Sequence, residues 1–232
     1  MTPLLECKAL TKKYGNTLAL NNINLTLERG RIIGLLGPNA SGKTTLIKLI
    51  NGLLTPTGGE VLINGQKPGP ESKLAIAYLP DTTFLCEWMN VEQLIDYYKD
   101  FYNNFDSQKA YDMLARLNIG KKMKLKAMSK GTKEKVQLIL TMSRKADLYC
   151  LDEPIGGVDP ASRDYILETI INNYNPEGSI LISTHLISDI EKVLDEIVLI
   201  QGGNLYMHKT VDEIREEKGM SIDGLFREVF RC

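Results

Sequence analysis

The chain has 232 residues, of which 43% are hydrophobic and 25% are charged, and its formal net charge at pH 7 is -1. These values exclude an intrinsically disordered chain. The near-zero charge argues against nucleic-acid binding as the main activity, so no nucleic-acid partner is predicted. The length is typical of one substantial domain rather than two.

The four cysteines, at positions 7, 86, 150 and 232, show no C-x-x-C spacing, and residues 1–15 lack the apolar core of a signal peptide. No run of the sequence approaches the about 18 consecutive apolar residues that cross a bilayer. We therefore expect a reduced, cytosolic protein, whose membrane crossing, if one is needed, is supplied by another chain.

Strands of two kinds are predicted in the first 63 residues. Apolar and polar residues alternate over 18–27, which is typical of a half-exposed antiparallel strand. Residues 32–36 are continuously apolar, as in a strand that is buried on both faces. Turn-forming residues flank a third short strand at 61–63. This part of the chain therefore predicts a mixture of antiparallel and buried sheet.

Residues 88–140 predict a helical lobe, because their apolar residues recur at three- and four-residue spacing. Apolar strands return within residues 146–154, 178–185 and 196–203, and helical stretches separate them. Strands and helices in alternation indicate a parallel α/β sheet.

Residues 37–45, GPNASGKTT, fit the phosphate-binding pattern G-x-x-x-x-G-K-[ST] and stand between a buried strand and a helical run. The backbone amides of such a loop surround the phosphates of a nucleotide, so we expect ATP here. Lys43 would reach the outer phosphates, and the Thr44 hydroxyl would bind Mg²⁺. The predicted nucleotide-binding residues of the loop are Gly37, Pro38, Asn39, Ala40, Ser41, Gly42, Lys43, Thr44 and Thr45.

Two carboxylates, Asp152 and Glu153, follow an apolar strand. Mg²⁺ takes oxygen ligands, and Asp152 can supply one. Because side chains alternate along a strand, Glu153 points to the other side, where it can orient a water for attack on the γ-phosphate. The alternative is that the two carboxylates only form a solvated turn, but the presence of a phosphate loop in the same chain disfavours it. His185 follows the next strand and can donate a hydrogen bond to the γ-phosphate, although a lone histidine is also common in structural positions, as we expect for His208.

Five motifs in this order, GPNASGKTT, MSKGT, LYCLDEP, VDP and STH, resemble those of the nucleotide-binding subunits of ATP-binding cassette (ABC) transporters. The resemblance covers nearly the whole chain. It implies a P-loop NTPase (RecA-like) α/β core with a small antiparallel β lobe, residues 1–81 and 145–232. An inserted α-helical lobe, residues 82–144, would complete one ABC ATPase domain.

In that family two cassettes pack head to tail, and each ATP lies between the phosphate loop of one and the signature helix of the other. The resemblance therefore implies that Ser129 and Gly131, in MSKGT, bind the γ-phosphate held by the partner subunit. The motif departs from the commonest signature, LSGGQ, by Lys130 and Thr132. It retains the serine and the second glycine.

The resemblance implies three further site residues. Tyr14 falls where the family stacks an aromatic ring on adenine, and an exposed tyrosine at a strand end is the alternative. Asp159 matches the loop that communicates across the dimer, and it can also cap a helix before Pro160. Asp81 falls in the lever between core and helical lobe, where the family usually has a glutamine near Mg²⁺. It is either an additional metal ligand or a lost contact.

We predict an ATP-binding and ATP-hydrolysing subunit that uses Mg²⁺, forms an ATP-sandwich dimer with an identical or unlike cassette, and drives separate transmembrane subunits from the cytoplasmic face. Residues 97–106, YYKDFYNNFD, resemble cassettes of bacterial peptide or antibiotic exporters, which favours export. A soluble P-loop phosphotransferase and a regulatory cassette without turnover are the alternatives. Cassettes of ribosome or DNA maintenance are disfavoured, because the chain has one phosphate loop and only a short interval between residues 45 and 129.

Overall fold

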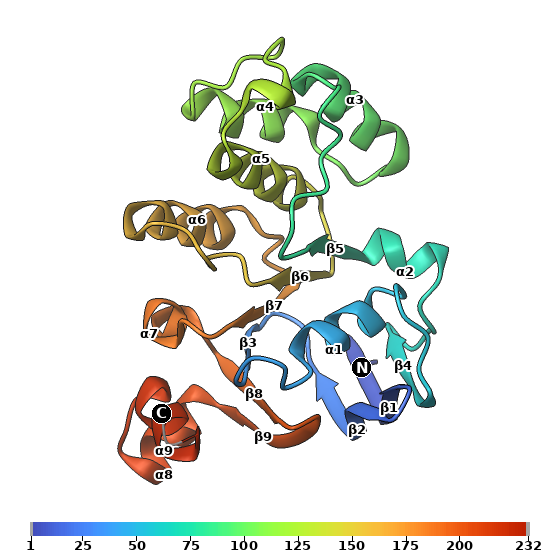
Figure 1. The fold of residues 1–232 in the computed structure, drawn as a ribbon, viewed down its shortest axis with the longest axis vertical. Helices are drawn as coiled ribbons and strands as arrows, with labels where there is room; N and C mark the ends of the chain where they lie inside the picture. Colours follow the sequence, from blue (N-terminus) through green and yellow to red (C-terminus); the bar gives the residue numbers. More distant parts are fainter. Residues whose placement is uncertain (1, 231–232) are drawn as a thin grey trace.

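A six-stranded sheet runs through the molecule with helices on both faces, and a three-stranded sheet lies beside it (Figure 1). The computed structural model describes residues 2–230. The larger sheet has the order β5-β6-β7-β3-β8-β9, in which β9 is antiparallel to β8 and the other neighbours are parallel. Its strands are β3 (Ile32–Leu36), β5 (Ile76–Leu79), β6 (Leu148–Asp152), β7 (Ser179–Thr184), β8 (Glu196–Gln201) and β9 (Asn204–Thr210). The predicted α/β class is confirmed.

The smaller sheet is antiparallel and has the order β2-β1-β4. Its strands are β1 (Leu5–Tyr14), β2 (Thr17–Leu27) and β4 (Gly58–Ile63). The alternating residues 18–27 lie in β2, whose inward side chains are buried and whose outward ones are exposed, as predicted. The short strand expected at 61–63 is the end of β4.

Nine α-helices and two 3₁₀ turns connect these strands within residues 2–230. The helices are α1 (Lys43–Ile50), α2 (Pro70–Ala75), α3 (Val91–Phe101), α4 (Ser107–Arg116), α5 (Lys130–Met142), α6 (Pro160–Asn173), α7 (Ile187–Ile190), α8 (Val211–Lys218) and α9 (Ile222–Phe230). The 3₁₀ turns are η1 (Leu125–Ala127) and η2 (Glu191–Val193). None of the helices in this described part of the chain has the length and apolar character that crossing a lipid bilayer requires.

Strand β3 is buried on both faces because each face of the large sheet has its own hydrophobic core. Ile33 and Leu35 pack in the core under α1 and the small sheet, whereas Ile32 and Leu36 pack in the core on the opposite face, with α6 and α7. This division follows the two-residue period of a strand. The continuous apolar run predicted this double burial, and the phosphate loop begins where the run ends.

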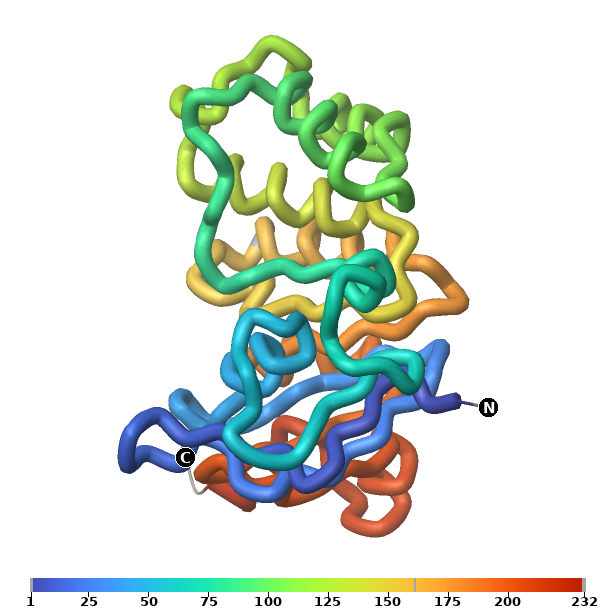
Figure 2. The backbone as a smooth tube through the Cα atoms, turned by 90° about the vertical axis from the view of Figure 1, so that its right-hand side faces the viewer, coloured from blue at the N-terminus to red at the C-terminus, as the bar shows by residue number. Residues whose placement is uncertain are grey.

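Helices α3, α4 and α5 form a lobe above the sheets in both views of the molecule (Figures 1 and 2). The lobe has its own hydrophobic core, drawn from residues between 85 and 140, in which Leu94, Leu114 and Ile139 are buried. The end of α5 lies one short connection from β6, which carries the carboxylate motif. Leu138 and Met142 of α5 pack in the core of the large sheet, so this helix joins the lobe to the sheets.

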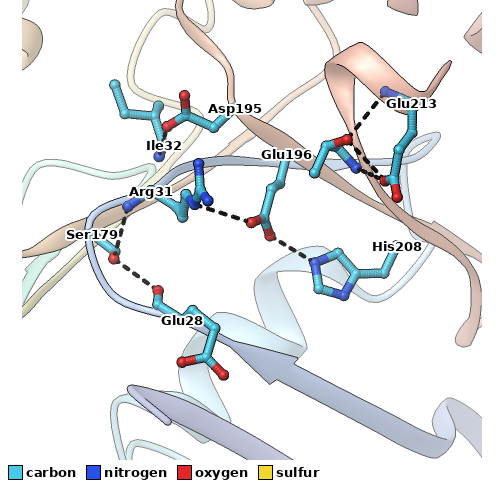
Figure 3. A network of polar contacts seen from close by, with 9 residues as sticks. Glu28, Arg31, Ile32, Ser179, Asp195, Glu196, His208 and Glu213 are labelled. Atoms are coloured by element: carbon cyan, nitrogen blue, oxygen red, sulfur yellow. Dashed lines mark hydrogen bonds and ion pairs between the residues drawn. The ribbon is translucent and has the colours of Figure 1, made fainter. Parts of the chain in front are cut away.

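A polar network at the other edge of the core fixes the start of β3 (Figure 3). Glu196 lies between Arg31 and His208: its Oε1 is 3.5 Å from Arg31 Nε, and its Oε2 is 2.9 Å from His208 Nε2. The Ile32 amide donates to Asp195 Oδ2 at 2.8 Å. His208 thus joins β9 to β8 and to the residue before β3, which agrees with a structural role.

Candidate active site

The phosphate loop, residues 37–42, runs from β3 to α1 in a conformation that glycine permits at two points. Gly37 has φ 156° and Gly42 has φ 113°. A Cβ atom on Gly37 would lie 2.3 Å from the Ile200 carbonyl oxygen, and one on Gly42 would lie 2.7 Å from the Ala19 carbonyl oxygen. Because neither contact is possible for a real side chain, glycine is required where the loop packs against β8 and β2.

Lys43 lies inside this loop and is 6% exposed. Its Nζ donates to the carbonyl oxygens of Gly37 at 2.8 Å and Pro38 at 3.1 Å. Burial lowers the pKa of Lys43, and the nearby charges of Glu153 and Asp152 oppose that shift. The buried Ser41 hydroxyl has no hydrogen-bond partner within residues 2–230. An ammonium and a free hydroxyl in a glycine loop are suited to binding phosphate oxygens.

Asp152 ends β6 and is fully buried. Its Oδ1 accepts hydrogen bonds from Ser183 Oγ at 2.5 Å and from Thr44 Oγ1 at 3.2 Å. Its Oδ2 has no partner within the part of the chain that the structure describes. An unpaired buried carboxylate oxygen beside a hydroxyl oxygen fits the hard oxygen ligands that Mg²⁺ prefers.

Glu153 adopts a left-handed backbone conformation, with φ 49°. Its amide donates to the Ser183 carbonyl oxygen at 3.0 Å and to Ser183 Oγ at 3.1 Å, which fixes this strained geometry. The side chain therefore departs from the path of the strand, and Glu153 Oε2 lies 3.0 Å from His185 Nδ1. The structure thus brings the two predicted catalytic residues, Glu153 and His185, into direct contact.

Asp81 follows β5 and belongs to the lever segment, residues 80–90, which leads to α3. It is exposed and makes no hydrogen bond or ion pair within residues 2–230. Its negative charge contributes to raising the pKa of Asp152, after the larger effect of burial. A small crevice of about 40 Å³ is lined by both Asp81 and Glu153. Asp81 therefore faces the carboxylate pair without touching it.

Ser129 and Gly131 lie at the start of α5, in the helical lobe, whereas the phosphate loop precedes α1 in the core (Figure 1). Ser129 caps α5, because its Oγ accepts from the Thr132 amide at 3.2 Å. A Cβ atom on Gly131 would meet no atom within 4 Å. The helix start thus faces open space, and the structure does not bring it to the phosphate loop of the same chain.

Tyr14 and Asp159 each lie at the end of a secondary-structure element. Tyr14 is 46% exposed at the end of β1, and Lys12 Nζ lies 5.2 Å from the centre of its ring. Asp159 caps α6, accepting from the Ser162 amide at 3.1 Å, and hydrogen bonds from Ser162 lower the pKa of its carboxyl. The cap expected before Pro160 is confirmed.

Two polar residues of this region, Ser183 of the STH motif and Gln137, were not predicted as site residues. Ser183 contacts both Asp152 and the Glu153 backbone, and the two-residue period of β7 puts it on the same side as His185. Gln137 is buried on α5 and contacts the lever segment. The sequence signal that could have identified Gln137 is a polar residue within the apolar stretch 136–140 of a predicted helix.

The raised pKa of Asp152 predicts a pH dependence of stability. Because the folded-state pKa of Asp152 lies above the ordinary 3.8, the contribution of this group to stability is fully present below pH 3.8. It is lost as pH rises toward the raised pKa. Without Mg²⁺, the unfolding free energy of the unchanged chain relative to that of Asp152→Asn should therefore fall as pH rises through this window, by at most about 1.4 kcal/mol per pH unit. The relative melting temperature should fall with it. Thermal melts from about pH 4 to 8 check this, and a constant difference would contradict it.

Comparisons with known proteins identify the family of the chain. The family model described as ABC transporter matches residues 20–156. The chain is 31% identical to the ABC transporter ATP-binding protein YtrB of Bacillus subtilis, over 92% of this chain and 74% of YtrB. It is 30% identical to the ABC-type transporter ATP-binding protein EcsA of the same organism, over 97% of this chain and 96% of EcsA.

A solved structure titled as the ATP-binding subunit of an ABC transporter superposes with a TM-score of 0.88. It is 31% identical to this chain, and the match covers 98% of this chain and 99% of that one. This confirms the predicted P-loop NTPase fold and disfavours a small-molecule phosphotransferase. The chain belongs to the ABC transporter family, in which it is an ATP-binding subunit and an ATPase.

Proposed function

We propose that this ATPase forms an ATP-sandwich dimer whose closing and opening drive separate transmembrane subunits. The observation that carries the proposal is the separation of Ser129 and Gly131 from the phosphate loop of their own chain, together with the open space that Gly131 faces. A second cassette, identical or unlike, would bring its phosphate loop to this helix start, where a hydroxyl and free amides suit a γ-phosphate.

The loop amides and Lys43 would hold the phosphates, with Tyr14 stacked on adenine and Asp159 reaching across the dimer. Thr44 Oγ1 and Asp152 would hold Mg²⁺, with Asp81 as an additional ligand through water, and Asp152 Oδ2 is the ligand atom still free. When bound, Mg²⁺ neutralises charge on the outer phosphates.

Glu153 would orient the attacking water and accept its proton. The water oxygen bonds to the γ-phosphorus, and the bond from that phosphorus to the oxygen bridging the β- and γ-phosphates breaks, which releases ADP and phosphate. His185 Nδ1, 3.0 Å from Glu153 Oε2, would donate to the carboxylate, and with both ring nitrogens protonated its Nε2 would donate to the γ-phosphate. The first of these roles rests on the contact between the two side chains.

The transmembrane partner would dock in a groove of about 570 Å³ between the core and the helical lobe. Exposed aromatic side chains of Phe84, Tyr97 and Phe101 line it, and Lys48 and Lys73 lie on its core side. We therefore infer a cytoplasmic segment with an apolar anchor and an acidic residue. This docking would place the subunit peripherally on the cytoplasmic face of the membrane. The resemblance of residues 97–106 to exporter cassettes favours a peptide or antibiotic-like substrate, moved outward.

Phe101→Ser should release the subunit from membranes without stopping its ATP hydrolysis. The side chain is 63% exposed, so its loss removes apolar contact area from the groove and leaves the cores intact. The measurement is the fraction that sediments with membranes of the native host, compared with Tyr206→Ser, which alters an aromatic residue on β9 that is 52% exposed. Equal sedimentation of both variants and the unchanged chain would contradict the docking site.

A further inference from the structure

The lever segment, residues 80–90, climbs from the core to the helical lobe along one side of the molecule (Figure 2). Its upper half is bonded to the lobe through the backbone. The Glu87 carbonyl oxygen accepts from the Lys126 amide at 3.2 Å, and the Met89 carbonyl oxygen accepts from the Leu125 amide at 3.0 Å. The upper half therefore moves with the helical lobe.

Within residues 2–230, the hydrogen bonds that attach the lower half, residues 80–84, to the lobe come from one buried side chain, Gln137 of α5. Its Oε1 accepts from the Phe84 amide at 3.1 Å, and its Nε2 donates to the Thr82 carbonyl oxygen at 3.2 Å. A carbonyl at one residue and an amide two residues later are the groups that a neighbouring β-strand would pair. The side-chain amide of Gln137 thus pairs the two backbone groups of residues 82 and 84 in the way that a neighbouring strand would.

This contact is stronger than the other side-chain contact between α5 and the lever. Gln137 itself is 2% exposed, so its amide makes both hydrogen bonds from a buried position, and its removal would leave two partly buried backbone groups of the lever unpaired. Lys133 of α5 also pairs with Glu87, but the Glu87 side chain is 62% exposed, and exposed ion pairs contribute little. Gln137 is therefore the residue that fixes the lower half of the lever.

The lower half of the lever carries Asp81 to the crevice that this residue shares with the catalytic carboxylate Glu153. Asp81 directly precedes Thr82, and the crevice that Asp81 shares with Glu153 is also lined by Gln137. We propose that Gln137 is a positioning residue for ATP hydrolysis, which ties the lever to the signature helix α5 and so holds Asp81 beside Asp152 and Glu153. The inference rests on the proposed function of these carboxylates.

Gln137→Met tests this, because methionine keeps the length of the side chain and makes neither hydrogen bond. The matched control is Ser143→Ala, which removes a buried hydroxyl that donates only to the Ile139 carbonyl oxygen of the same helix, at 2.7 Å. Gln137→Asn is the second variant, since its amide is too short to reach both lever groups.

Two measurements without nucleotide report on the lever. Hydrogen exchange of the peptide covering residues 80–90 should become about tenfold faster or more in Gln137→Met, while the peptides of α3 and α4 keep their protection and so show an intact fold. Trp88, the single tryptophan of the chain, is 73% exposed on the lever. Because Trp88 lies in the upper half, between the two backbone hydrogen bonds to the lobe, its fluorescence anisotropy should stay unchanged in Gln137→Met and in Ser143→Ala, which would show that only the lower half has loosened.

Steady-state kinetics then connect the lever to the reaction. Gln137→Met and Gln137→Asn should lower kcat for MgATP about tenfold and leave KM nearly unchanged, because the phosphate loop is untouched. A lever that loosens with an unchanged kcat, or that does not loosen, would overturn the proposal. An unchanged chain without any ATP turnover would instead overturn the proposed function, and the exchange data would still decide whether Gln137 holds the lever.

Discussion

Glu153→Gln protein is expected to bind MgATP but to hydrolyse it at least about 100-fold more slowly than the unchanged chain. The amide keeps the shape of the side chain and the hydrogen bond with His185, but it cannot accept the proton of the attacking water. With hydrolysis blocked, the closed pair should accumulate, because a ligand that binds only the dimer stabilises it. Light scattering should therefore show a monomer without nucleotide and a dimer with MgATP.

Glu177→Gln is the control, since Glu177 is exposed in the turn before β7, at the opposite end of that strand from His185. It should retain turnover and remain without a stable MgATP dimer. A Glu153→Gln protein that stays monomeric with bound ATP would mean that an unlike cassette or a membrane subunit completes the site. Absence of turnover in the unchanged chain would favour a regulatory cassette.

Mixing two inactive variants should restore ATP hydrolysis if each site spans two chains. Lys43→Met removes the ammonium of the phosphate loop, and Ser129→Arg places a large cation where the partner's γ-phosphate would lie. Each variant alone should lose at least about 99% of its turnover. Random pairing makes half of the dimers mixed, and each mixed dimer has one intact site, so about a quarter of the normal activity should return.

The measurement is the ATPase rate against the mixing ratio at fixed total protein, which should peak at equal amounts. Unchanged inactivity of the mixture would contradict a shared site between identical chains. Full activity of Ser129→Arg alone would show that the start of α5 takes no part in catalysis.

The phosphate loop and the strand-end carboxylates could be predicted because their chemistry is local. Gly37 and Lys43 are separated by only six positions, and the loop lies between a strand and a helix that are adjacent in the chain. The helix cap at Asp159 was equally readable, since a cap depends on residues within one turn. These features depend on residues close together in the sequence, so they can be predicted without knowledge of tertiary contacts.

Other features depend on contacts between distant segments, which a periodic pattern does not contain. Ser183 bonds to Asp152 only because β6 and β7 pair in parallel. Gln137 meets the lever across more than fifty positions. Strand β1 also gave no clear pattern, because irregularities in its pairing, including Ala9 at φ 50°, break the alternation of its side chains.

The left-handed backbone at Glu153 has a consequence for how this sequence can change over generations. Glycine adopts φ 49° freely, whereas a glutamate there is strained by about 1–3 kcal/mol. A population screened only for heat resistance would therefore accumulate glycine or asparagine at position 153 and lose ATP turnover as it became more robust. Glutamate persists at this position only where natural selection rewards the chemistry that it performs.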